Sequence, residues 1–243
     1  PGEAFLLFYV GFGAAVLWIA STLRKILESG PVPNLGELDP YLIAQLRGGE
    51  AEATKVAIAS LLDRQLIRND ATLREPAETV DVATLHPIER GVVEASRGGM
   101  SISDMINAGP STNELAANIE EALQRRDLLP QTSQIVLRVV LGLGAVSMLV
   151  AVTAHRMSLA AGRGHYNVGA LYYTTIIMAL LIGLSMHGRR THLGDRVVRD
   201  FMILFAGLVA RAHTLPRGSR ELPYLVAVFG TGALNSGAHA DLF

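Results

Sequence analysis

Three long apolar stretches stand out from the alternation of apolar and polar residues along the chain. They cover residues 5–22, 135–153 and 168–186, and Arg138 is the one charged residue within them. A helix needs about 20 apolar residues to cross a bilayer core of about 30 Å. Lipid offers no partners to backbone polar groups, so such stretches must be helical. The pattern therefore predicts a membrane protein, mainly α, with three transmembrane helices.

Basic residues flank these stretches unevenly. Arg24 and Lys25 follow the first, Arg125 and Arg126 precede the second, and four arginines follow the third, whereas residues 155–167 carry two. Lysine and arginine accumulate on the cytoplasmic side of membrane proteins. We therefore expect a multi-pass protein with its N-terminus outside and both the 28–131 segment and the C-terminus in the cytoplasm. No basic region precedes the first stretch, which indicates an anchor and not a cleaved signal peptide.

Residues 28–131 form the polar segment in which helix signals occur. Asp39-Pro40 resembles an N-cap followed by proline at the first helical position, and Gly48-Gly49 ends that helix. A second helix is expected over Glu50–Arg64, and short strands over residues 66–70 and 79–85. The apolar spacing of the second helix predicts five core residues: Val56, Ile58, Ala59, Leu61 and Leu62.

The same segment contains a weak internal repeat. Leu38-Asp39-Pro40 recurs as Leu85-His86-Pro87, and residues 60–67 recur as residues 122–129, a helix end with a basic residue followed by two aliphatic ones. The order of helix, helix and short strand is that of winged-helix units. Two diverged winged-helix-like copies and a chance likeness both remain open.

Charge qualifies the DNA-binding function that a winged helix suggests. Residues 28–131 contain 17 acidic and nine basic residues, about −8, whereas the rest of the chain is about +7. Affinity for nucleic acid comes mainly from Lys and Arg on phosphates. The charge therefore disfavours nucleic acid as a partner and favours a protein-docking or structural module.

The C-terminal region, residues 188–243, combines arginines with an amphipathic pattern. Apolar residues of 193–212 recur at helical spacing, and a helix in the headgroup layer would place them in lipid with arginines near anionic headgroups. The alternative is a helix packed on the protein's own soluble module. Residues 222–234 could dock on the spans, re-enter the interface or contact a partner. The candidate lipid or partner contacts are Arg189, Arg190, Arg196, Arg199, Phe201 and Phe205.

Residues that would carry catalysis form no recognisable pattern. The chain lacks cysteine, its seven histidines include no i, i+4 pair with a nearby carboxylate, and no phosphate loop occurs. Intramembrane ionisable groups, which transporters normally need, are missing apart from Arg138. A haem or pigment ligand at His155 or His187 is the less favoured alternative to an interfacial histidine. We expect no enzyme activity, no cofactor and no metal site.

Four segments together carry a resemblance. They are the opening residues 1–9, the Leu-Asp-Pro-Tyr…Gly-Gly segment 38–49, the paired second and third spans, and the Val-Ala-Val-Phe-Gly-Thr-Gly-Ala-Leu segment 226–234. Their order resembles a family of uncharacterised bacterial membrane proteins, which implies the bacterial inner membrane. Members with a Gly- or Cys-rich tail differ from this chain, which ends Ala-Asp-Leu-Phe. The family carries no assigned catalytic residues.

These patterns divide the chain into an N-terminal anchor (1–27), an acidic soluble module (28–131), a helix pair (132–187) and a basic C-terminal region (188–243). The expected function is a non-catalytic accessory or scaffold subunit of a larger membrane complex, respiratory or photosynthetic, with other membrane-protein subunits and anionic lipid as partners. The alternative is a membrane-tethered regulator whose winged-helix-like module binds a ligand or DNA.

Overall fold

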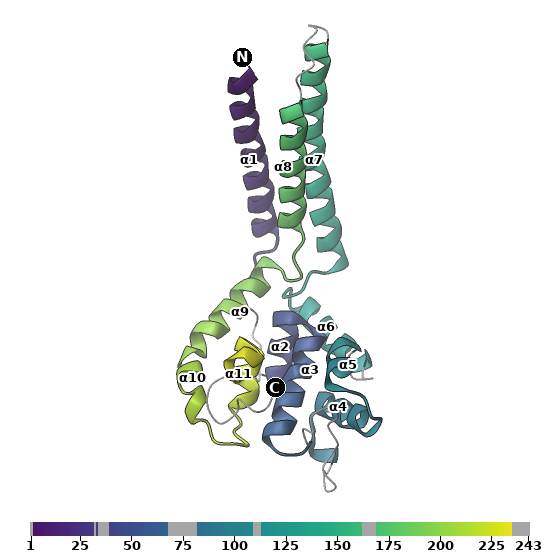
Figure 1. Ribbon diagram of the computed structural model, residues 1–243, viewed down its shortest axis with the longest axis vertical. Helices are drawn as coiled ribbons and strands as arrows, with labels where there is room; N and C mark the ends of the chain where they lie inside the picture. Colours follow the sequence, from purple (N-terminus) through teal and green to yellow (C-terminus); the bar gives the residue numbers. More distant parts are fainter. Residues whose placement is uncertain are drawn as a thin grey trace. The chain divides into compact units, whose positions relative to one another are not determined.

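The computed structural model describes residues 2–31, 33, 39–67, 82–108, 113–161 and 169–234. Over these ranges the protein is all-α, with eleven α-helices and no strand (Figure 1). Contacts divide the chain into two units. The first contains residues 1–31 and 130–193, and the second contains residues 32–129 and 194–243.

Three helices build the first unit: α1 (Gly2–Leu27), α7 (Thr132–Ala161) and α8 (Gly169–Met186). All three are long and apolar enough to cross a membrane, which confirms the three predicted stretches. Residue 168 of the third stretch lies outside the described residues.

Side by side, α1, α7 and α8 share a narrow core (Figure 1). Tyr9, Leu149 and Ile182 lie at most 1% exposed in this core. Large apolar side chains on the outer faces, such as Trp18 (70% exposed) and Leu143 (63%), are mostly uncovered by protein. An all-round apolar helix needs an apolar surround, and lipid supplies one.

Short capped helices open the second unit. Asp39 accepts a hydrogen bond from the Tyr41 N–H at 2.9 Å and caps α2 (Pro40–Gly48), as the sequence predicts. Gly49, at φ 89°, separates α2 from α3 (Glu50–Asp63), and only glycine tolerates this backbone conformation easily. The five predicted core residues of α3 are all buried.

The rest of the segment is helical where it is described. It contains the 3₁₀ turn η1 (Val82–Thr84), α4 (Pro87–Arg97), α5 (Ile102–Ala108) and α6 (Asn113–Arg125). The prediction of a strand over 79–85 is wrong for Val82–Thr84, because a turn here leads directly into the His86 cap of α4. Ile67 makes an isolated bridge and no strand, while residues 68–70 and 79–81 of the two predicted strands lie outside the described residues.

The ends of α3 and α6 have the same geometry. Gln65 and Asp127, equivalent positions in the weak repeat, adopt left-handed φ angles of 57° and 56°. The next residue in each case donates its N–H five positions back, from Leu66 to the Leu61 carbonyl at 2.8 Å and from Leu128 to Leu123 at 3.0 Å. This is the Schellman form of helix termination.

The C-terminal region contains several short helices where one long amphipathic helix was predicted. These are α9 (His192–Leu204), α10 (Ala206–Ala210), the 3₁₀ turn η2 (Ala212–Thr214), α11 (Leu222–Phe229) and the 3₁₀ turn η3 (Thr231–Leu234). The α9 helix breaks at Phe205, so the predicted stripe is interrupted and Leu204 is 67% exposed.

The apolar 222–234 stretch forms part of the core of the second unit. Helix α11 packs on α2 and α3, and Leu225, Val226 and Ala227 are fully buried. None of the three expectations for this stretch included a place in the core of the chain's own second unit. Its short length favours a core helix, and Gly230, at φ 86°, ends it as the sequence suggested.

Candidate functional sites

The best-connected polar site of the first unit is centred on the carboxylate of Glu28. This residue follows α1 and is 5% exposed. Its Oε1 accepts from Arg138 Nε of α7 at 2.5 Å and from Arg24 Nε at 3.1 Å. Its Oε2 accepts from the backbone N–H of His192 at 3.1 Å. We call Arg24, Glu28 and Arg138 the arginine clasp.

Backbone carbonyls complete the arginine clasp. Arg138 donates through Nη1 to the carbonyl of Gly188 and through Nη2 to that of Arg190 at 2.9 Å. Arg24 donates to the carbonyl of Ser185 just before the end of α8. One buried charge cluster thus joins the ends of α1, α7 and α8.

The electrostatics of the arginine clasp are those of a structural tie. Burial raises the pKa of Glu28, but hydrogen bonds and charge from Arg138 and Arg24 outweigh burial, so the pKa lies below its ordinary value of 4.5. Glu28 therefore stays ionised at neutral pH, with its oxygens already accepting three bonds.

A second, neutral tie lies about 22 Å along α7 from Arg138, at a rise of 1.5 Å per residue. The Tyr9 hydroxyl bonds to Thr153 Oγ1 of α7 at 2.8 Å and to Thr175 Oγ1 of α8 at 2.9 Å. The two threonine hydroxyls lie 2.9 Å apart. Lipid offers no hydrogen-bond partners to hydroxyl groups, so polar side chains bond across helices instead. The triad therefore fixes how far the three helices are shifted along one another.

In the second unit, polar residues gather around the carboxylate of Glu89, which is 4% exposed. Its Oε1 accepts from the Tyr41 hydroxyl at 2.6 Å, from Ser60 Oγ at 2.9 Å and from the Arg64 guanidinium. Its Oε2 accepts from the backbone N–H of His86 at 3.2 Å. Helices α2, α3 and α4 each contribute to this group, which we call the Glu89 cluster.

Opposing effects set the titration of the Glu89 cluster. Burial raises the pKa of Glu89, but bonds from Arg64 and Tyr41 prevail and hold that pKa below 4.5. Burial, and then the charge of Glu89, raise the pKa of Tyr41 far above its ordinary value of 10.0. A cavity of about 310 Å³ lies beside the cluster, and the His86 ring stacks on that of Tyr41 at 4.1 Å.

The residues predicted to contact lipid or partners have different surroundings. The side chains of Arg189, Arg196 and Arg199 are exposed, and that of Arg190 is half-buried. Phe201 is 6% exposed, so its ring faces protein and not lipid. Phe205 is half-buried and stacks on Tyr224 of the second unit at 5.7 Å. Because both rings lie against protein, the structure favours the alternative of a helix packed on the chain's own residues.

Sequence reasoning missed both buried carboxylates. Arg138 stands out in the sequence as a lone charge in an apolar stretch, but its partner Glu28 lies 110 positions away, in the segment that the sequence assigns to the soluble module. For Glu89 a local signal existed, because a cap at His86 followed three positions later by glutamate is a capping box. No three side chains in the described part of the chain converge as metal ligands would.

Comparison with known proteins yields no relative. No family model, no curated protein and no solved structure matches the chain.

Proposed function

We propose that this chain is a non-catalytic accessory subunit of a membrane complex, anchored by α1, α7 and α8. The observation that carries the proposal is an exposed apolar surface on α9 and α10. Met202 and Val209 are each 39% exposed, Leu204 is 67% exposed and Ile203 is 75% exposed. Bare apolar side chains grouped in this way mark sites of protein or membrane contact.

The place of this surface in the chain supports docking at the membrane. Only five residues of chain, 187–191, separate the start of α9 from the end of α8, a helix long and apolar enough to span a membrane. Exposed Arg196 and Arg199 precede the apolar residues. Methionine and arginine are both enriched in interfaces between proteins.

The roles of the buried charges support a structural protein. Glu28 and Glu89 accept several hydrogen bonds each and carry lowered pKa values. A general acid or base at neutral pH needs a pKa nearer 7 and access to substrate. Both carboxylates serve instead as ties between helices.

Orientation is part of the proposal. The arginine clasp brings together the helix ends that carry Arg24, Lys25, Arg138, Arg189 and Arg190. At the other end of the unit Arg156 lies 3.9 Å from the centre of the Phe5 ring. This excess of basic residues at the clasp end supports our proposal that this end and the residues of the second unit face the cytoplasm of a bacterium.

Purification from native membranes in mild detergent tests the docking role. We expect the chain to co-purify with other membrane proteins, in a respiratory or photosynthetic assembly. The double variant Ile203→Glu, Leu204→Glu should lose these partners, whereas Gln65→Glu, a charge added at another exposed site, should retain them. A chain that always migrates alone at its own mass would contradict the proposal.

A membrane-tethered regulator is the second candidate. The matched helix ends at Gln65 and Asp127, together with proline-led, side-chain-capped starts of α2 and α4, support two diverged winged-helix-like copies. The full chain in detergent should then shift duplex DNA in a salt-dependent manner. Absence of any shift at low salt would remove the DNA-binding form of this candidate.

A further inference from the structure

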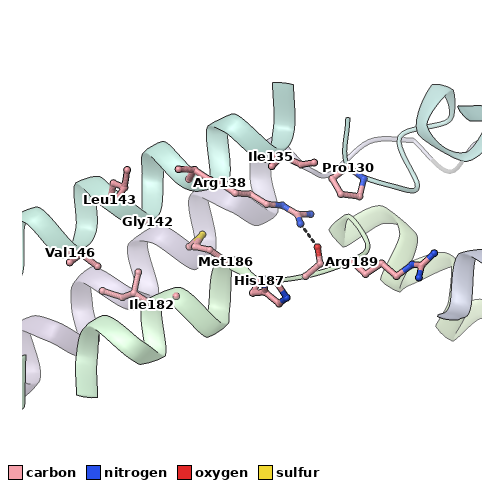
Figure 2. A pocket seen from close by; sticks show the side chains of 13 residues that line it. Pro130, Ile135, Arg138, Gly142, Leu143, Val146, Ile182, Met186, His187 and Arg189 are labelled. Atoms are coloured by element: carbon pink, nitrogen blue, oxygen red, sulfur yellow. Dashed lines mark hydrogen bonds between the residues drawn. The ribbon is translucent and has the colours of Figure 1, made fainter. Parts of the chain in front are cut away.

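A groove of about 540 Å³ runs between α7 and α8 beside the arginine clasp. Figure 2 shows Leu143 and Val146 on one wall and Ile182 and Met186 on the facing helix. These residues belong to two of the stretches apolar enough to cross a membrane. The walls are therefore suited to an acyl chain and not to a water-soluble ligand.

Two glycines open this groove. A Cβ added at Gly142 would lie 3.4 Å from Met186 Cγ, and one added at Gly183 would meet nothing within 4 Å. The missing side chains leave room for an apolar occupant. Space at Gly183 also means that a larger side chain can enter the groove without disturbing the helices.

The clasp end of the groove is cationic. Arg138, His187 and Arg189 line this end, and Figure 2 shows Arg138 bonded to the Gly188 carbonyl and the Arg189 side chain extending away from it. The same helix ends carry Arg24, Lys25 and Arg190, while Glu28 is the acid of the clasp. The residues that line the groove include two arginines and one histidine and no acidic residue. Basic pockets between transmembrane helices bind anionic headgroups.

We propose that the groove between α7 and α8 is a binding site for an anionic phospholipid. One acyl chain lies along Leu143, Val146 and Ile182, and the phosphate lies at the level of His187 and Arg189. Apolar walls that end in basic side chains match the two parts of such a lipid. The site rests on the proposed membrane anchoring, but it does not depend on docking to other subunits.

Native mass spectrometry of the full chain in detergent tests the site, with phosphatidylglycerol and phosphatidylcholine of identical acyl chains as probes. We expect preferential retention of phosphatidylglycerol. Gly183→Leu should weaken its binding at least about tenfold by filling the groove. Gly11→Leu is the matched control, because Gly11 is exposed on α1 and its Cβ would also meet nothing within 4 Å.

Headgroup recognition has its own variant. Arg189→Gln should reduce the preference for phosphatidylglycerol over phosphatidylcholine while leaving phosphatidylcholine binding unchanged. Equal binding of the two lipids by the natural chain, or equal effects of Gly183→Leu and Gly11→Leu, would overturn the proposal. So would loss of a co-purifying protein, and not of lipid, in Gly183→Leu. Failure to find partner subunits would refute the accessory role and leave the lipid site standing.

Discussion

Glu28 is the residue on which the joint between the three membrane helices depends most directly. Its carboxylate pairs with Arg138, and the exposed fractions of the two side chains are 3% and 6%. A buried pair contributes little net stability, but removal of one partner leaves a buried charge uncompensated. We therefore expect joint replacement of Glu28 and Arg138 to destabilise the protein less than replacement of Glu28 alone.

Glu28→Gln should lower the free energy of unfolding by about 3–5 kcal/mol. Glu121→Gln is the control, since Glu121 and Arg125 form an exposed pair whose loss should cost under about 0.5 kcal/mol. Thermal unfolding in detergent measures both. The double variant Glu28→Leu, Arg138→Leu should recover part of the loss, and no difference between Glu28→Gln and Glu121→Gln would contradict the clasp.

The Glu89 cluster should limit stability at both extremes of pH. Below about pH 4.5 the unfolded carboxyl takes up a proton more readily than folded Glu89, so this contribution declines as pH falls through the lowered folded pKa. Tyr41 acts at the alkaline end of the range. Above about pH 10 the unfolded tyrosine loses its proton while folded Tyr41, with its raised pKa, keeps it, so the free energy of unfolding falls as pH rises.

Melting temperature measured against pH tests this expectation. Glu89→Gln should flatten the acid side of the profile, and Tyr41→Phe should flatten the alkaline side. Tyr173→Phe, a change at a tyrosine that is 68% exposed, should leave the alkaline side unchanged. An alkaline side equally steep in Tyr41→Phe and the natural chain would refute the assignment.

At the scale of elements, the backbone conformation at the ends of helices sets where the chain of the second unit changes direction. Gln65 ends α3 in the left-handed region, where a side chain costs about 1 kcal/mol and glycine costs little. Gln65→Gly should therefore stabilise the protein by about 0.5–1 kcal/mol.

The control for this change lies in the interior of a helix. Glu94 is exposed on α4, where Glu94→Gly should destabilise by about 1 kcal/mol. Chemical denaturation of the detergent-solubilised chain measures both variants. Destabilisation by both glycines would show that the end of α3 does not need the left-handed residue.

For the whole molecule, topology is the property open to a direct test, because the chain contains no cysteine. Three single variants place a thiol at exposed positions. Ser29→Cys lies near the clasp end of α1, Ser103→Cys lies on α5, and Ser158→Cys lies near the end of α7 that is opposite the clasp. An impermeant maleimide applied to intact cells should label Ser158→Cys alone. Ser29→Cys and Ser103→Cys should react only after the membrane is opened, and the reverse pattern would invert the orientation.

Local patterns were sufficient for the features that depend on neighbouring residues. Long apolar stretches marked α1, α7 and α8, and Asp39-Pro40 with Gly48-Gly49 marked both ends of α2. The spacing of Val56, Ile58 and Leu61 identified the buried face of α3. These signals are local because helix length, capping and periodicity are settled within a few turns of chain.

Long-range packing decided the rest. Glu28 and Arg138 are 110 residues apart, and α11 joins α2 and α3 across about 180 residues, so no local pattern could pair them. The amphipathic pattern of 193–212 was compatible with lipid or protein, since both bury apolar side chains. Only the fold shows Phe201 covered and Ile203 bare, because burial is a property of what surrounds a residue and not of its own chemistry.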